Sequence, residues 1–475
     1  MKLRSLFPLA LGSLLLASLP AHADSTEDIL EMLMNKGVLT KEEVSKISDR
    51  RKSEKVADEE SHKADIRPVF KDGIRLETAD KSQSLGFNGR IQADYRYFDK
   101  NAAESADTFD IRRAFMTMQG RYYKYYDFNI TADFANVANG SHLDEAYFGI
   151  NWWDQARLRF GQFKMPFGME QDTSDIFTEF QERALLDVLT PGKERGAMLF
   201  GNPTKGVFYG LATSTGRGKN INNTDNQVDG LDIIGRASVN FAQFLGNKDA
   251  VYHLGAGFSR GELSPNQVVA PTARTEARGV AFFTPTAFTH DNSDDLTRTR
   301  YGLEMAVAQG PFKVQAEWMK HNYEGKTSLH QNFDKDIKAW YAAASWLVTG
   351  EHFADSYGSM GLFGRINPKK NFDIGNGTGT GAVLLSLRYS DFDGSDFAAG
   401  SGPVGSGNVA AGTATGAHAW TAGVQWILNP NTRLVLDYVD TKFTGGVARY
   451  TKSNNNATAT ADDERALTAR AQFDF

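Results

Sequence analysis

The sequence predicts an all-β fold: a 16-stranded antiparallel transmembrane β-barrel that follows a short N-terminal helical segment. About 16 segments alternate apolar and polar side chains, as expected of strands with one face in lipid and the other in water. Short and long connections alternate between them, which is typical of membrane barrels. After the first 23 residues, no segment approaches the 18 apolar residues of a spanning helix, so any crossing must use closed strands.

The composition agrees with this fold. Glycine occurs 45 times and aromatic residues make up 12% of the chain, a balance suited to strands and tight turns. The chain has no cysteine, so an exported protein of this sequence must be held together without disulfides, for example by a closed ladder. The formal net charge of -6 sums wall, loop and inner charges and therefore does not indicate which solutes bind.

Residues 1–23 have the features of a secretory signal peptide. Lys2 and Arg4 precede an apolar run that ends near Leu19, and Ala21-His22-Ala23 follows as a small-residue cleavage site. The alternative is a membrane anchor, but the apolar run is shorter than the roughly 20 residues that a spanning helix needs. We expect cleavage before Asp24.

Residues 24–63 form a helical periplasmic segment or linker in this prediction. Thr26 is placed to cap a first short helix that Gly37 ends, and Thr40 with Glu43 forms a capping-box pattern for a second. Charged residues dominate after Asp49. A solvated linker and an oligomerising coiled coil both fit, because the apolar repeat is short.

The barrel is expected over residues 64–475, with period-two alternation from Ser84 onward. In the first strand, Phe87, Ile91 and Tyr95 share one face while Arg90 shares the other with further polar residues. The predicted strands are 85–98, 109–121, 124–135, 143–152, 156–164, 196–201, 206–213, 229–240, 251–260, 298–308, 311–322, 336–347, 381–391, 417–428, 432–443 and 465–475.

The connections and the last strand predict a location in the bacterial outer membrane with both termini in the periplasm. Long connections at 165–195, 214–228, 261–297, 392–416 and 444–464 would face outward, and short ones the periplasm. Segment 348–380 is long yet falls on the periplasmic side, so it has structure of its own or hides a strand pair near 360–366. The terminal Phe475 closes an alternating strand of the kind that the barrel-assembly machinery reads.

The segment from about 165 to 195 differs from the other connections. Pro166 and Gly168 end the preceding strand, and about 30 residues follow that are too apolar for a disordered tether. We expect this segment to pack inside the barrel and narrow it. Its aromatic residues, such as Phe177, then serve packing rather than stacking of sugars, which is the alternative.

Four motifs resemble the phosphate- and polyphosphate-selective porins, the porin O and P family: GFNGRIQADY (86–95), FDIRRAF (109–115), LDEAY (143–147) and RFGQFKMPFGMEQ (159–171). The resemblance covers residues 66–475. It implies an outer-membrane porin, a homotrimer of water-filled barrels, each with its third loop in the lumen and an arginine- and lysine-lined path for passive diffusion of small anions such as phosphate. Outer-membrane lipid surrounds such a barrel.

The resemblance also assigns residues. It places Arg90, Arg112, Arg113 and Asp144 near the constriction, Lys71 and Lys81 at basic positions of the barrel start, and Arg274 and Arg278 at the entry together with Arg298 and Arg300. The constriction loop is represented by Lys164, Glu170, Gln171 and Ile176. Phosphate-specific members carry two lysines in this loop where Gln171 and Ile176 stand here, so the sequence does not predict phosphate specificity.

Strand alternation supports an anion path from the residues themselves. It places Arg157 and Arg159, like Arg90, on the inner face, where successive arginines offer an anion several weak sites. Arg112 and Arg113 are adjacent, so only one faces inward unless the strand bulges. In the alternative, these arginines pair with inward and loop carboxylates, which leaves a general, cation-preferring or nutrient-specific porin.

Other classes are less well supported by the sequence. A barrel hydrolase needs a nucleophile beside a base, but Ser141 and His142 are adjacent and point to opposite sides of an extended chain. The sequence has no HExxH, phosphate-binding GxxxxGK[ST] or calcium-loop motif, so we expect no enzyme activity, metal, nucleotide or other cofactor, and no nucleic-acid partner. A structural barrel or adhesin would not need a loop inside the lumen.

Overall fold

The structure is a computed structural model. It describes residues 30, 32–61, 63–70, 73–100, 107–221, 230–263, 271–286, 296–326, 330, 332–397, 409–451 and 454–475. The expected signal peptide (1–23) and Lys71 lie outside the described residues. The chain divides into two units, Met1–Asp65 and Ile66–Phe475.

The first unit contains helix α2 (Lys41–Ser61). Its start has the predicted capping box: the Thr40 backbone N–H donates to the Glu43 carboxylate at 2.8 Å, and the Glu43 N–H donates to Thr40 Oγ1 at 3.3 Å. No helix in the described part of the chain is long and apolar enough to cross a lipid bilayer.

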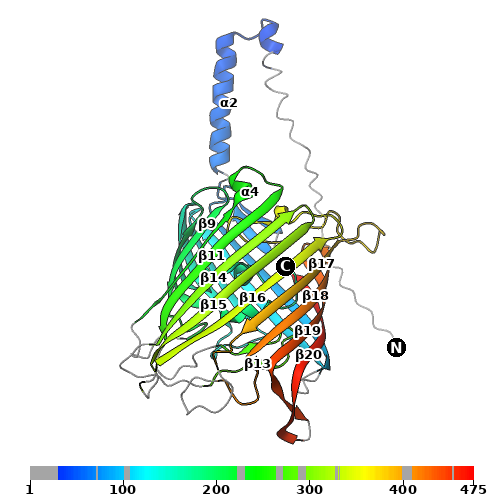
Figure 1. Ribbon diagram of the computed structural model, residues 1–475. Helices are drawn as coiled ribbons and strands as arrows, with labels where there is room; N and C mark the ends of the chain where they lie inside the picture. Colours follow the sequence, from blue (N-terminus) through cyan, green and yellow to red (C-terminus); the bar gives the residue numbers. More distant parts are fainter. Residues whose placement is uncertain are drawn as a thin grey trace, which may run out of the picture. The chain divides into compact units, whose positions relative to one another are not determined.

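The second unit is a closed antiparallel barrel, which confirms the predicted fold (Figure 1). Each barrel strand pairs with the next along the chain, and the last pairs with the first. The 16 barrel strands in the described residues are β3 (Ser84–Lys100), β4 (Thr108–Tyr122), β5 (Tyr126–Asp133), β6 (Leu143–Trp153), β7 (Ala156–Lys164), β8 (Lys193–Gly201), β9 (Val207–Ser214), β10 (Asp232–Asn240), β11 (Ala250–Leu263), β14 (Leu296–Gln309), β15 (Phe312–Lys326), β16 (Asn332–Leu347), β17 (Ala382–Asp393), β18 (Gly416–Asn429), β19 (Thr432–Thr451) and β20 (Asn454–Asp474).

The strands are apolar outside and polar inside, as their alternation predicts. On β18, Trp420 and Val424 are exposed at 51% and 43% of their surface, whereas Thr421 and Gln425 are each 1% exposed. Lipid would cover the outer residues, while the inner ones face other polar groups of the lumen. We call the end of the barrel with the turns after β4, β6 and β8 the turn end, and the opposite end the loop end.

The sequence did not predict two short hairpins. Strands β1 (Ile66–Phe70) and β2 (Ile74–Thr78) pair with each other, and β2 extends the sheet beside the first residues of β3. Strands β12 (Ala273–Arg274) and β13 (Ala281–Phe283) lie within the connection between β11 and β14. Each is too short to show a period-two pattern, which explains why alternation missed them.

The prediction of a long loop at 444–464 was wrong. Strands β19 and β20 continue as a paired hairpin through most of this segment, with a register shift between Lys442 and Val447. Gly445 and Gly446 have positive φ angles and occupy this irregularity. A composition rich in Gly, Asn and Thr is typical of a loop and gives no apolar–polar alternation. A hairpin held by backbone hydrogen bonds needs no apolar face, so the sequence pattern did not indicate it.

Segment 348–381 has structure of its own rather than a missed strand pair. It contains the 3-10 helix η2 (Phe353–Ser356) and isolated bridges from Tyr357 to Phe363 and from Asp373 to Thr378. Phe353 and Phe363 are buried and belong to an apolar cluster that includes Met169 of the third loop, the connection between β7 and β8. This segment therefore enters the barrel from the turn end. A short helix, α4 (Phe241–Phe244), occupies the turn before β11.

We expect Gly89→Ala to weaken barrel closure. The backbone N–H of Gly89 donates to the carbonyl of Phe475, and the Phe475 N–H donates back. A Cβ atom at Gly89 would lie 2.7 Å from both the Phe115 carbonyl oxygen and the Phe475 ring. The resulting overpacking should cost about 1–3 kcal/mol, measured as a lower temperature at which the folded band disappears on electrophoresis. Gly86→Ala is the control, since its Cβ would meet nothing closer than 3.6 Å; equal midpoints for the two variants would contradict the prediction.

Candidate functional site

The third loop, residues 165–192, crosses the lumen and is fixed to the wall opposite its own strands. Phe167, in the KMPFG sequence, is fully buried. Its ring fills a notch that Gly257 of β11 and Gly302 of β14 create as cross-strand partners. A Cβ atom added at either glycine would lie 3.1–3.4 Å from the Phe167 ring. The notch therefore sets where the loop leaves its parent strand.

Hydrogen bonds to the loop backbone continue this attachment. The short helix α3 (Met169–Asp172) begins against Glu317 of β15, whose carboxylate accepts the N–H groups of Met169 and Glu170 at 2.8 and 2.7 Å. Further along, Gln181 donates its N–H to Asp437 of β19 at 2.6 Å. Because each carboxylate accepts from the backbone, the contacts do not depend on the loop side chains.

Arginines of the later strands hold loop carbonyl groups. Arg388 of β17 donates to the Glu182 carbonyl at 3.1 Å, and Arg433 of β19 donates to the carbonyls of Asp175 and Thr178 at 3.1 and 3.0 Å. Apolar residues fill the adjoining space. The loop is thus packed against β11 to β20 inside the barrel, as the sequence predicts.

A cavity of about 1750 Å³ remains between the loop and the inner faces of β3 to β9. It extends from Lys219 at the loop end to Asn431 at the turn end. Basic side chains outnumber acidic ones among its lining residues. The basic residues are Arg90, Arg112, Arg113, Arg159, Lys164, Arg183, Lys193, Lys219 and Arg365, and the acidic ones are Asp133, Asp144, Glu145, Asp172, Asp175 and Asp474.

A β-bulge turns both members of the arginine pair inward. The register between β3 and β4 shifts so that Arg112 is the extra residue. Its guanidinium donates to Glu182 of the loop at 2.8 Å, and that of Arg113 contacts Asp175 at 2.5 Å. The pair therefore fixes two successive points of the loop.

Arg90 joins the same network. It contacts Asp175 at 2.9 Å and lies 4.0 Å above the Phe115 ring. Burial alone would raise the pKa of the Asp175 carboxyl, but Arg113 and Arg90 hold that pKa well below its usual range. Burial also opposes ionisation of Glu182, yet Arg112 keeps the pKa of the Glu182 carboxyl well below its usual range. These loop carboxylates, outside the spanning strands, stay charged at neutral pH.

Asp144 lies in the lining between two lysines that the sequence reasoning did not single out. Lys193 forms an ion pair with it, and Lys219 contacts its other oxygen at 2.9 Å. Lys193 also contacts Glu145 at 3.1 Å. Lys193 opens β8, but alternation from the inward Met198 would place it on the outer face with Leu199, so the strand pattern does not indicate it. Lys219 belongs to a connection with no periodic pattern, and no sequence signal indicates it.

The two arginines of β7 differ in environment. Arg157 donates to the Asn202 side chain at 2.8 Å and does not line the cavity. Arg159 does line it, with its guanidinium 4.1 Å from the Tyr147 ring centre. Lys164, at the end of the same strand, donates to backbone carbonyls of the loop, including those of Gln171 and Thr173 at 2.9 and 3.0 Å.

The loop residues aligned with the family motif take different positions. Gln171 and Ile176 line the cavity, and Gln171 is 8% exposed with no hydrogen-bond partner for its Oε1 atom among the described residues. Glu170 does not line it: its carboxylate accepts from Arg388 at 3.1 Å and from the Ala184 N–H at 3.0 Å. Burial raises the pKa of Glu170 to about 7.

Several predicted residues lie away from the cavity. Lys81 occupies the exposed turn between β2 and β3, and Arg274 and Arg278 are exposed residues around the β12–β13 hairpin. Arg298 contacts Asp232 at 2.7 Å and Arg300 contacts the same carboxylate at 3.5 Å. None of these described residues lines the cavity, so the residues expected at the entry are not part of it.

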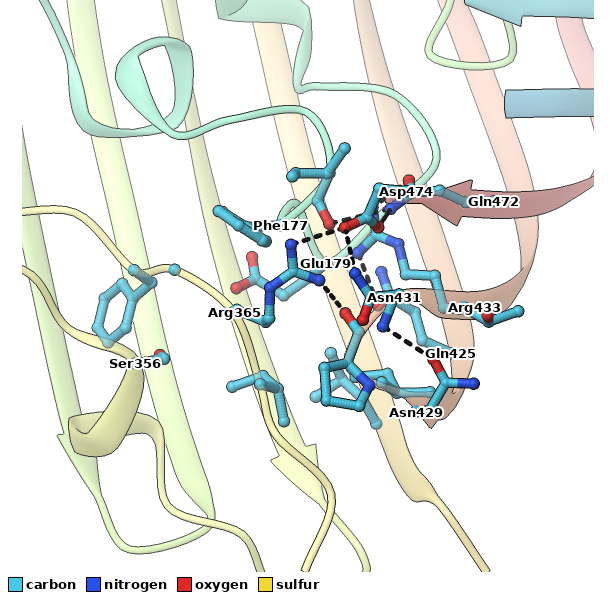
Figure 2. A pocket seen from close by; sticks show the side chains of 18 of the residues that line it. Phe177, Glu179, Ser356, Arg365, Gln425, Asn429, Asn431, Arg433, Gln472 and Asp474 are labelled. Atoms are coloured by element: carbon cyan, nitrogen blue, oxygen red, sulfur yellow. Dashed lines mark hydrogen bonds and ion pairs between the residues drawn. The ribbon is translucent and has the colours of Figure 1, made fainter. Parts of the chain in front are cut away.

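At the turn end, the loop tip meets segment 348–381 (Figure 2). Arg365 donates to the Pro430 carbonyl and contacts Asp474 of the last strand at 2.6 Å. Its guanidinium also lies 5.2 Å from the Phe177 ring of the loop. A small pocket of about 30 Å³ lies beside these residues, and Arg365 lines both this pocket and the large cavity.

A closed barrel with an apolar outer surface and a charged cavity beside an inserted loop defines a channel-forming membrane protein. The family model described as phosphate-selective porin O and P matches residues 85–475. This chain belongs to that family. It is a porin of the bacterial outer membrane, a channel and not an enzyme.

Individual proteins are also similar. Porin O of Pseudomonas aeruginosa is 28% identical over 448 residues, which cover 87% of this chain and 93% of that protein. Among solved structures, the anion-selective porin from Comamonas acidovorans has a TM-score of 0.48 at 10% identity, covering 83% of this chain and 100% of its own. OmpT of Vibrio cholerae matches with the same score and identity, covering 83% and 98%.

We expect Phe167→Ala to loosen the third loop. Removing a fully buried ring costs about 3–5 kcal/mol of packing, so the loop should leave the Gly257–Gly302 notch part of the time. Single-channel recordings should show a higher mean conductance and more current noise than the native channel. Phe148→Ala, at a lipid-facing position that is 54% exposed, should leave both unchanged. A Phe167→Ala channel with native conductance would show that the notch does not position the loop.

Proposed function

We propose that the lumen conducts small anions by passive diffusion. The observation that supports this is the lining of the large cavity, where the described residues include nine basic and six acidic side chains. Arginine stays protonated at every physiological pH and presents several donors, so an anion can exchange one partner for the next. The net positive charge of the lining favours anions over cations in the lumen.

A second candidate, a weakly selective general porin, rests on the loop carboxylates. Asp175 and Glu182 neutralise part of the charge of Arg90, Arg112 and Arg113. The excess of basic groups in the lining favours the anion channel over this alternative. It does not favour a dedicated phosphate site, because uncharged Gln171 and Ile176 stand at the two loop positions where phosphate-specific members carry lysine.

We also propose that the functional unit is a homotrimer in outer-membrane lipid, as the family resemblance implies, and that the barrel-assembly machinery recognises the last strand ending in Phe475. In this proposal residues 1–23 are removed, residues 24–63 lie in the periplasm and both chain ends face that compartment. Chemical cross-linking of the protein in native membranes would give a ladder ending at three subunits.

We expect the double variant Arg112→Ala/Arg113→Ala to lose anion preference. The change removes two of the nine basic groups and leaves Asp175 and Glu182 less compensated. If each charge contributes on the order of 0.5 kcal/mol in hydrated space, the anion-to-cation permeability ratio should fall about fivefold. The measurement is the reversal potential across a salt gradient in planar bilayers.

The matched control for that variant is Lys205→Ala/Lys248→Ala. Both lysines are exposed in turns and neither lines the cavity. The control should keep the native reversal potential. An unchanged reversal potential in the arginine variant would reject the assignment of this pair to the anion path.

We expect Gln171→Lys/Ile176→Lys to create phosphate block. Both positions line the cavity, so added ammonium groups would bind a multivalent anion there. Inorganic phosphate should then reduce the chloride current at concentrations about tenfold lower than in the native channel. The double variant Gln171→Met/Ile176→Met, similar in side-chain length but uncharged, serves as the control. Equal phosphate block in all three channels would mean that these positions do not face the permeating ion.

A further inference from the structure

Arg159 differs from the other basic residues of the large cavity. Eight of the nine contact a carboxylate or a backbone carbonyl of another described residue. The partner is Asp175 for Arg90 and Arg113, Glu182 for Arg112, and Asp144 for Lys193 and Lys219. Lys164 and Arg183 donate to loop carbonyls, and Arg365 contacts Asp474. No described residue gives Arg159 a hydrogen bond or an ion pair, and its Nε atom is buried without a partner. Buried or half-buried charges are normally paired. No contact with a described carboxylate therefore neutralises this guanidinium.

Aromatic rings orient Arg159 without using its donors. The guanidinium carbon lies 4.1 Å from the ring centre of Tyr147, 5.0 Å from that of Phe200 and 5.7 Å from that of Phe163. Contacts between a cation and the face of a ring leave the N–H groups in the guanidinium plane free. Such a guanidinium is prepared to donate two parallel hydrogen bonds to a planar anionic group.

Part of the cavity lining on the strands that follow Arg159 is apolar. Met198 is the direct cross-strand partner of Arg159 on β8, and it lines the cavity together with Pro166 and Phe208. Pro166 packs against Gly210 of β9, where a Cβ atom would lie only 2.9 Å from the proline ring. None of these three side chains carries a hydrogen-bond donor. A carboxylate can use both of its oxygens on the arginine, whereas a phosphate carries further charged oxygens for which these three side chains offer no donor.

We propose that Arg159 and the apolar surface of Pro166, Met198 and Phe208 form a binding site for organic carboxylates with an apolar body, such as aromatic monocarboxylates. The carboxylate accepts from the guanidinium and the body lies on the three apolar side chains. The proposal rests on the anion channel proposed above and names a class of solute for it. The site adds the hydrophobic effect to the charge that all small anions share.

The experiment measures how added anions reduce the chloride current through the full-length channel in planar bilayers. Benzoate, acetate and inorganic phosphate are compared at one pH and ionic strength. Benzoate should reduce the current at concentrations about tenfold lower than acetate, because only benzoate buries a ring. Phosphate should be no more effective than acetate in the native channel.

Variants assign the effect to this site. Arg159→Gln should raise the benzoate concentration for half-reduction about tenfold. Met198→Ser/Phe208→Ser should raise it for benzoate but not for acetate. The control is Arg157→Gln, which changes an arginine two residues away that donates to Asn202 and does not line the cavity; benzoate should act on it as on the native channel.

Two readouts separate this inference from the function it rests on. The reversal potential in potassium chloride tests anion preference by itself, and a cation-selective native channel would reject the proposed function. If the channel prefers anions but benzoate and acetate act equally, or phosphate acts more strongly than benzoate, the carboxylate site is rejected alone. Undiminished benzoate block in Arg159→Gln would also reject it. The folded-band assay checks that each variant has formed its barrel.

Discussion

The attachment of the third loop to strands β11 to β20 is the constraint on which the rest of the lumen depends. A loop of 28 residues left free in a water-filled bore would sample many positions, since each ordered residue loses conformational entropy. Here Phe167 is fixed in a glycine notch and the backbone is bound by Glu317, Asp437 and Arg433. One side of the barrel is filled by these contacts, so the open cavity lies on the other side, along β3 to β9.

This division also sorts the charges. Arginines of the later strands are largely committed to holding the loop, as Arg388 and Arg433 show. Arginines of the early strands reach the loop across the cavity edge and remain in its lining, as Arg90 and Arg113 do. Arginines that hold the loop and arginines that line the cavity therefore belong to different parts of the wall.

The sequence predicted the barrel well because alternation is a local property of each strand. All 16 barrel strands overlap the predicted segments, and the lumen position of Arg90 follows from the same pattern. Contacts between distant segments were beyond it. The sequence alone shows Gly257 and Gly302 as ordinary strand glycines, because only the pairing of β11 with β14 places them side by side. The bulge at Arg112 likewise depends on the register with β3.

The cavity could be anticipated only in part for the same reason. Lys219 reaches Asp144 across 75 residues from a connection without periodicity. Arg157 and Arg159 share a face by alternation, yet only Arg159 lines the cavity, because the loop and the neighbouring strand decide what each can reach. Lys81 belongs to a hairpin turn that lies outside the barrel strands.

Glu182 has a consequence for the order of assembly. Its carboxylate accepts from Arg112 of β4 and, at 3.0 Å, from Arg470 of β20, two strands that flank β3. Strand β20 reaches this place only when it pairs with β3 and completes the cylinder. The final seating of the inner loop thus waits for the two ends of the sheet to join. Glu182 therefore bridges the two strands that flank β3 only in the closed barrel.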